Sequence, residues 1–134
     1  MRPRHRARQL ALRVVFQLDQ DPGDWRPAFA YQLAEDDLPP ESAAFAEELV
    51  ALVQEHRVEI DAALQAAATH WKLEQMGRVE RGVLRLGAAE LIWRRRDPQA
   101  VTLDEAVGLA KELGGEDAAR FVNGVLGQLA REAV

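Results

Sequence analysis

RVERGVLRLGAAELIWR, residues 78–94, is the stretch that decides the fold of this chain. On a helix of about 100° per residue, its apolar side chains cover most of the circumference and leave a narrow stripe of Arg78, Arg81 and Arg85. A helix that is apolar nearly all round belongs in the middle of a helical bundle. We therefore expect a central helix over 78–94, with the arginine stripe as a solvated face. Glu90 lies among the apolar residues, and we expect a buried, hydrogen-bonded structural acid rather than a catalytic one.

Apolar residues at helical spacing mark six further helices, and no stretch alternates as a β-strand does. The expected ranges are about 3–19, 26–34, 41–55, 57–70, 102–113 and from 116 onward. The stripe that marks the helix over 57–70 is Ile60, Leu64, Ala67, Ala68 and Trp71. Thr102 with Glu105 has the spacing of a capping box, and Gly114-Gly115 is typical of a helix end. We expect an all-α fold, a single-domain helical bundle of about seven helices.

Length and composition limit the classes of protein. The chain has 134 residues and no cysteine, so we expect one domain over 1–134 without disulfides or thiolate metal sites. No apolar run is long enough to span a membrane, and the start lacks the apolar stretch of a signal peptide, so we expect a cytoplasmic protein. His5, His56 and His70 lack metal-ligand spacing, and HExxH, GxSxG and GxxxxGK[ST] patterns are absent. We expect no catalytic residue, metal or cofactor.

Charge is strongly segregated along the chain. The first thirteen residues hold five arginines, Arg2, Arg4, Arg6, Arg8 and Arg13, with one histidine and no acid. The remainder has 12 basic against 22 acidic side chains, so a body of net charge about −10 carries a head of about +5. Such a head attracts a polyanion, which we expect to be nucleic acid, while the acidic body confines it to one part of the surface.

The basic run continues into a predicted helix. Residues 7–18 form one apolar stripe at helical spacing, and Pro3 is tolerated in a first helical turn. A helix over about 3–19 would hold the arginines rigidly, which favours a binding face over a frayed, solvated tail. Phe16 falls on the outward face with Arg13, and we interpret it as an anchor for a partner rather than a chance surface aromatic.

The last predicted helix contains an unfavourable glycine. Gly124 costs about 1 kcal/mol relative to a good helix former, and Phe121 precedes it by three residues. Bare backbone at this place suits either close helix packing or the approach of a ligand, and the residues leave both open.

Three blocks of the chain together resemble the NusB family of transcription antitermination factors. They are RARQLALRVVFQLD (6–19), RVERGVLRLGAAEL (78–91) and LDEAVGLAKELGGEDAARFVNGVLGQLA (103–130). The most specific part is GGEDAARFVNGVL (114–126), and the likeness runs from about Arg4 to Ala130. The resemblance implies an all-helical fold of two packed helical subdomains without catalytic activity.

The resemblance also implies partners. Family members bind the single-stranded boxA sequence of nascent ribosomal RNA transcripts together with NusE, a small-subunit ribosomal protein. In a complex with RNA polymerase and other Nus factors, they promote read-through of terminators.

The resemblance and the basic head together indicate site residues. The family's arginine-rich start matches Arg4, Arg6 and Arg8, and its RNA-contacting C-terminal element matches Asp117, Arg120 and Phe121. The expected RNA-binding residues are therefore Arg2, Arg4, Arg6, Arg8, Arg13, Asp117, Arg120 and Phe121. Arginines neutralise phosphates, whereas the C-terminal element would stack and select bases. The family's NusE-facing positions match Phe16 and Glu80, an aromatic anchor and an acid suited to a basic ribosomal protein.

Other classes of protein stay open. One is a self-associating helical structural protein with Phe16 and the first helix at its interface, so the sequence decides neither for a monomer nor for a homodimer. Another is the helical RNA-binding domain attached to some ribosomal RNA cytosine methyltransferases, although 134 residues leave no room for their Rossmann-like domain.

Overall fold

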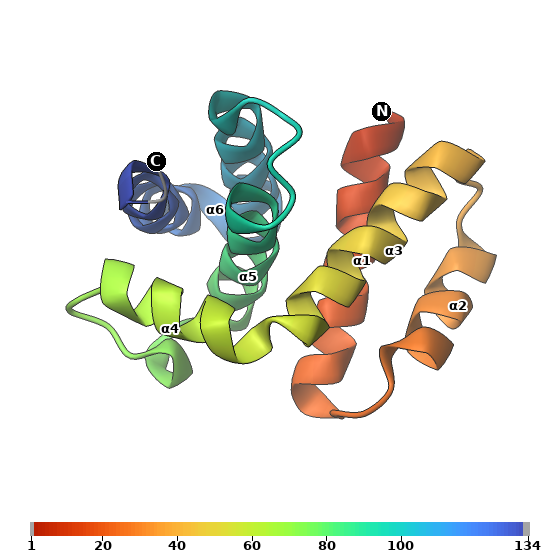
Figure 1. The fold of residues 1–134 in the computed structure, drawn as a ribbon, viewed down its shortest axis with the longest axis horizontal. Helices are drawn as coiled ribbons and strands as arrows, with labels where there is room; N and C mark the ends of the chain where they lie inside the picture. Colours follow the sequence, from red (N-terminus) through yellow and green to blue (C-terminus); the bar gives the residue numbers. More distant parts are fainter. Residues whose placement is uncertain (1, 133–134) are drawn as a thin grey trace. The chain divides into compact units, whose positions relative to one another are not determined.

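The computed structural model describes residues 2–132, and within that range the chain forms six α-helices, one 3₁₀-helix and no strand. The helices are α1 (Pro3–Gln20), α2 (Trp25–Glu35), α3 (Pro40–Glu55), α4 (Arg57–Ala67), η1 (Leu73–Gln75), α5 (Arg78–Ile92) and α6 (Gln99–Glu132), as Figure 1 shows. The expected all-α class is confirmed. Among the described helices, none combines the length and the apolar character needed to cross a membrane.

The chain divides into two compact units, the first ending at Glu55 and the second beginning at His56. In the first unit, α1 packs against both α2 and α3. The apolar stripe predicted for residues 7–18 is buried in full. It comprises Ala7, Leu10, Ala11, Val14, Val15 and Leu18, and the core is completed by α3 residues such as Phe45, Leu49 and Val53. Amphipathic helices with stripes of this width bury them against neighbouring helices, which is why three of them form a stable unit.

In the second unit, α5 packs against both α4 and α6. Every residue from Gly82 to Leu91 is buried, which confirms the prediction of a central helix. Gly87 allows α6 to approach closely, because a Cβ atom added there would lie 2.6 Å from Cδ1 of Leu126. Close approach of this kind lets α6 cover part of the apolar circumference of α5.

The prediction that the α5 arginines form a solvated face holds for Arg78, which is exposed, but is wrong for Arg85 and only partly right for the half-buried Arg81. Arg85 is only 5% exposed and donates to the Asp61 carboxylate of α4, with Nε 2.9 Å from Oδ1 and Nη2 3.2 Å from Oδ2. Arg81 donates to the backbone carbonyls of Leu73 and Met76 at 3.3 and 3.2 Å. Arginine can cover apolar surface with its stem while its head is paired, so periodicity alone does not place it in solvent.

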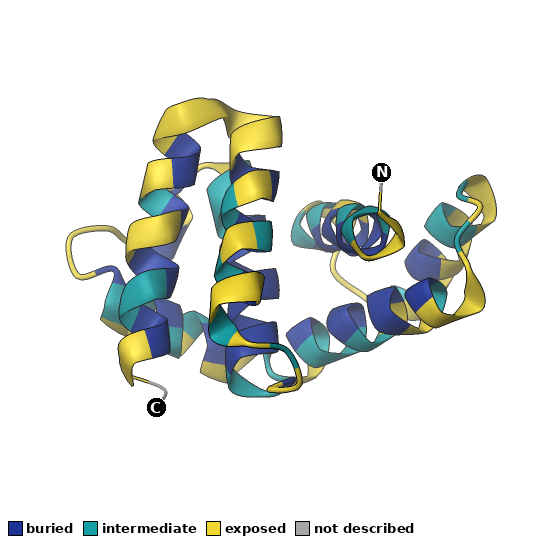
Figure 2. Cartoon of the chain, turned by 90° about the horizontal axis from the view of Figure 1, so that it is seen from above, coloured by how far each residue is buried: buried dark blue, intermediate teal, exposed yellow. Residues whose placement is uncertain are grey.

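The last two expected helices run on as α6, which contains a break at Gly115. Gly115 has φ 87° and ψ −173°, a conformation essentially restricted to glycine. Figure 2 shows the chain changing direction there, with residues 111–117 all exposed. The predicted Gly114-Gly115 boundary is thus present, and two helical segments lie on either side of it.

Two expectations about polar residues have different outcomes. Glu90 is 4% exposed and accepts a hydrogen bond of 3.4 Å from Oγ1 of Thr102, which confirms the buried, hydrogen-bonded acid. The predicted capping box at Thr102 is wrong, because α6 begins earlier, at Gln99, and the Thr102 amide is bonded to the carbonyl of Pro98. The buried carboxylate needed a donor, and the Thr102 hydroxyl supplies one from the neighbouring helix.

Candidate nucleic-acid interface

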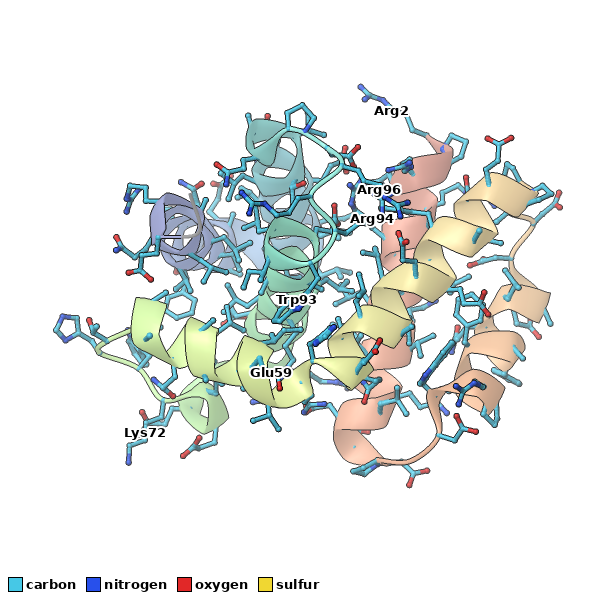
Figure 3. The ribbon with its side chains drawn as sticks, viewed as in Figure 1. Arg2, Glu59, Lys72, Trp93, Arg94 and Arg96 are labelled. Atoms are coloured by element: carbon cyan, nitrogen blue, oxygen red, sulfur yellow. The ribbon has the colours of Figure 1, made fainter. Side chains whose placement is uncertain are left out.

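The first arginines of α1 lie in different environments. Arg2 is exposed and extends past the first turn of α1 in Figure 3. Arg4 places its guanidinium 4.0 Å from the centre of the Phe45 ring, a cation–π contact. Arg6 donates to the backbone carbonyl of Asp37 at 3.0 Å. The basic head is therefore partly fixed against α3 and the segment before it.

Two of the expected phosphate-binding arginines, Arg8 and Arg13, make closer contacts with other residues of the protein. Arg8 is only 4% exposed, and its guanidinium lies 4.9 Å from the same Phe45 ring. It follows Arg4 by one helical turn, so both side chains fall on one face of α1. Arg13 donates from Nε to Oε1 of Gln32 at 3.1 Å and pairs with the Asp36 carboxylate. Arg8 is thus buried beside Phe45, a position that its charge did not indicate.

Phe16 is half-buried on α1 rather than openly exposed. The sequence interpretation placed it on the outward face with Arg13, which is itself exposed. Part of the Phe16 ring is therefore available to a partner, and part is already covered.

The expected C-terminal element lies at the start of the second segment of α6. Asp117 and Arg120 form an ion pair with each other, and their side chains are 95% and 73% exposed. Phe121 follows at intermediate exposure. Its ring meets the ring of Trp71 edge to face, with centroids 6.0 Å apart and planes at 85°. An acceptor, a guanidinium plane and an aromatic ring thus lie within a few residues of α6, and Trp71 adds a second ring from the segment after α4.

A pocket of about 230 Å³ opens beside this aromatic pair. Its lining includes Trp71, Met76, Glu80, Asp117 and Phe121. The Glu80 carboxylate lies over the backbone of Gly77, since a Cβ atom added to Gly77 would be 2.7 Å from Oε2. Glu80 and Phe121, which the sequence assigned to different partners, therefore border one pocket of the second unit.

Trp71 was missed as a site residue and was placed in the core stripe of the helix over 57–70. α4 ends earlier, at Ala67, and Trp71 is 52% exposed in the segment that follows. The available signal was the polar run around it, Thr69, His70 and Lys72, which is poor material for a buried helical turn.

Gly124 does not serve close helix packing in this structure. It is exposed, and a Cβ atom added there would meet no atom within 4 Å. The expectation of close helix packing at this glycine is therefore wrong.

Among residues 2–132, no group of three or more histidine, aspartate or glutamate side chains is arranged to hold a metal ion. The carboxylates and the guanidinium described above for the second unit suit hydrogen bonding, and its aromatic rings suit stacking.

The model of the NusB family matches residues 5–131, nearly all of the described range. The chain belongs to the NusB family. The resemblance inferred from the three sequence blocks is thereby confirmed.

Relatives named transcription antitermination protein NusB match over almost the full chain. The one from Sorangium cellulosum (strain So ce56) is 43% identical, over 97% of this chain and 93% of its own length. The one from Saccharopolyspora erythraea is 42% identical, over 97% and 88%. Matches of this extent leave no large part of the chain outside the NusB family.

Solved NusB structures share the fold. A crystal structure of the antitermination factors NusB and NusE in complex with dsRNA aligns at a TM-score of 0.89 with 31% identity, covering 98% of each chain. The solution structure of NusB from Aquifex aeolicus aligns at 0.85 with 31% identity, covering 98% of this chain and 89% of that one. The expected family fold is confirmed by these alignments.

Proposed function

We propose that this chain is a transcription antitermination factor that binds boxA RNA of nascent ribosomal RNA transcripts together with NusE and promotes read-through by RNA polymerase. The observation that carries the proposal is the pocket between Trp71 and Phe121, with Asp117 at its edge. Membership of the NusB family supports it, and so does the solved NusB that is bound to NusE and RNA.

The chemistry of the second unit suits unpaired RNA. Sequence-specific RNA recognition stacks splayed bases on aromatic rings or guanidinium planes and reads their edges with a few polar groups. Phe121 supplies a ring, Arg120 a guanidinium plane and Asp117 an acceptor. Asp117 and Arg120 are exposed and Phe121 is half-buried at the start of a helical segment, which leaves all three within reach of a ligand.

The first unit supplies positive charge. Arg2, Arg4 and Arg6 lie at the start of α1, and an arginine helix would neutralise phosphates and make affinity depend on salt. Arg13 could exchange Asp36 for a phosphate, since both are charge-assisted partners. Arg8 would act indirectly, by holding α1 against Phe45.

For NusE we propose contacts at Phe16 and Glu80. A half-buried aromatic can anchor a partner, and an acid at the first turn of α5 suits a basic ribosomal protein.

The experiment is a binding assay with single-stranded boxA RNA, a scrambled strand of equal composition and the boxA duplex, each with and without NusE. We expect boxA to bind best as a single strand and NusE to strengthen it. Equal affinity for boxA and scrambled RNA in both series would contradict the proposal. A stable dimer that ignores both RNA and NusE would favour the self-associating structural protein instead.

A further inference from the structure

Trp71 is a large aromatic side chain that the fold leaves half in solvent. It is 52% exposed, although it lies against Phe121. We propose that Trp71 and Phe121 form the two aromatic sides of a pocket that takes one unpaired nucleobase carrying an exocyclic amino group. The inference rests on the proposed RNA-binding function and assigns its base-recognition pocket.

The ring geometry leaves room for a base. At 85° the two rings meet edge to face, so the edge of one ring lies against one face of the other and the remaining ring faces are not stacked within the pair. A base can therefore stack on one ring while its rim touches the second ring. The pocket volume of about 230 Å³ lies below the roughly 300–1,000 Å³ of typical small-molecule sites. This size suits one planar base, with the thioether of Met76 lining the apolar side.

The segment that carries Trp71 is held in place before any ligand binds. Gln65 on α4 donates from Nε2 to the carbonyl of Trp71 and accepts at Oε1 from the amide of Leu73, at 3.1 Å. The Trp71 amide donates to the carbonyl of Ala68 at 3.2 Å. Lys72, the next residue, extends away from the ribbon in Figure 3. Fixing the backbone on both sides of Trp71 lowers the entropy lost when a base stacks on it.

The polar rim of the pocket indicates which bases fit. Asp117 lines it, and an ionised carboxylate only accepts hydrogen bonds. Adenine, cytosine and guanine present amino groups that donate to a carboxylate, whereas uracil presents carbonyl oxygens in their place. We therefore expect the pocket to prefer an amino-bearing base over uracil.

The first test compares Trp71→Leu, Trp71→Phe and, as a matched control, Trp25→Leu in the other unit. Trp25 belongs to the first unit and also meets a phenylalanine edge to face, with the centroids of Trp25 and Phe29 6.0 Å apart. Affinity for boxA RNA is measured without NusE, and circular dichroism checks folding. A lost base stack weakens binding about 5- to 150-fold, so we expect that loss for Trp71→Leu, a smaller one for Trp71→Phe and none for Trp25→Leu.

A second variant tests whether the position of the Trp71 ring matters, and not only its presence. Gln65→Met keeps Trp71 but removes the hydrogen bonds that hold its backbone, so Gln65 acts as a positioning residue. We expect intermediate weakening, with Trp71→Leu in the same chain adding less than it does alone, because the two changes affect one interaction.

The base itself is located with boxA RNA made abasic at one position at a time. At the position whose base occupies the pocket, the losses of binding free energy caused by the abasic site and by Trp71→Leu should not add. At every other position the two losses should add. Replacing an amino-bearing base by uracil there should weaken wild-type binding and leave Trp71→Leu almost unchanged.

The outcomes separate the two proposals. If the wild type does not distinguish boxA from scrambled RNA, the proposed function fails. If it does, and folded Trp71→Leu binds boxA normally, only the pocket assignment is overturned. If Trp71→Leu binds boxA normally but loses NusE, the pocket takes a protein side chain and the nucleobase assignment is wrong.

Discussion

Arg85 on α5 and Asp61 on α4 are joined by two hydrogen bonds, of 2.9 and 3.2 Å. Two nitrogens of the guanidinium donate to the two oxygens of the carboxylate. Arg57 adds a third bond to the same carboxylate at 3.3 Å. The Arg85 side chain is 6% exposed and that of Asp61 29%. Because a buried guanidinium needs its partner, this pair fixes how α4 crosses the central helix.

Asp61→Ala should lower the free energy of unfolding by about 3 kcal/mol, since it leaves the Arg85 charge buried without its carboxylate. Chemical denaturation measures the change. Lys111→Ala is the control, because its ion pair with Glu116 is largely exposed and worth less than about 1 kcal/mol. Equal effects of the two substitutions would mean that Arg85 finds another partner.

Gly115→Ala should destabilise the protein by about 1–3 kcal/mol, because φ 87° with ψ −173° is strained for any residue with a Cβ atom. Gly108→Ala, at an exposed helical position of α6 where an added Cβ meets nothing within 4 Å, should instead stabilise by up to about 1 kcal/mol. Thermal unfolding of both variants checks the opposite signs. A gain in stability for Gly115→Ala would contradict the helix break.

Gly124→Ala should separate stability from binding. Its site is open, so alanine should stabilise the helix by up to about 1 kcal/mol. If RNA approaches this bare backbone, the added methyl group should weaken boxA affinity. Gly108→Ala serves again as the matched control, with higher stability and unchanged affinity. Unchanged affinity in Gly124→Ala as well would remove Gly124 from the RNA surface.

The arginines of α1 should divide into two groups. Arg2→Ala should leave stability unchanged and reduce the slope of log affinity against log salt by up to about 0.7 for one phosphate contact. Arg8→Ala should instead cost about 2 kcal/mol of stability, because its buried guanidinium lies over Phe45. Unfolding curves and a salt titration of boxA binding measure both quantities. If Arg2→Ala has the same salt slope as the wild type, Arg2 contacts no phosphate.

Glu80→Lys should impair association with NusE, because it reverses a charge proposed to face a basic protein. The substitution also places a cation at the first turn of α5, where the helix dipole favours an anion, so a small loss of stability is expected. Glu80→Gln removes the charge without reversing it and should have a milder effect. The measurement is NusE binding without RNA, and normal binding by folded Glu80→Lys would sink this role.

Helix positions followed from the sequence because apolar spacing is a local property. The buried stripe of α1, the central position of α5 and the boundary at Gly114-Gly115 were all predicted from residues a few places apart. Thr102 shows the limit, since a capping box and a hydroxyl donor to Glu90 look alike until the partner helix is present.

The candidate site was predictable in part. The family resemblance indicated Asp117, Arg120 and Phe121, and the structure places them together at one helix start. Trp71 could not be found in this way, because its helical spacing suggested a core residue. Because α4 ends at Ala67, Trp71 lies outside the helix, and its ring contacts that of Phe121.

By itself, the sequence determined the all-α class, the central helix, the segregated charge and the family, because these depend on residue type and short-range periodicity. Tertiary structure alone decided which arginines are buried and which aromatic rings meet. Arg8 and Arg85 have the same chemistry as Arg2, but Phe45 and Asp61 reach them from other helices. Burial and pairing depend on partners distant in the chain, and no local pattern encodes where those partners lie.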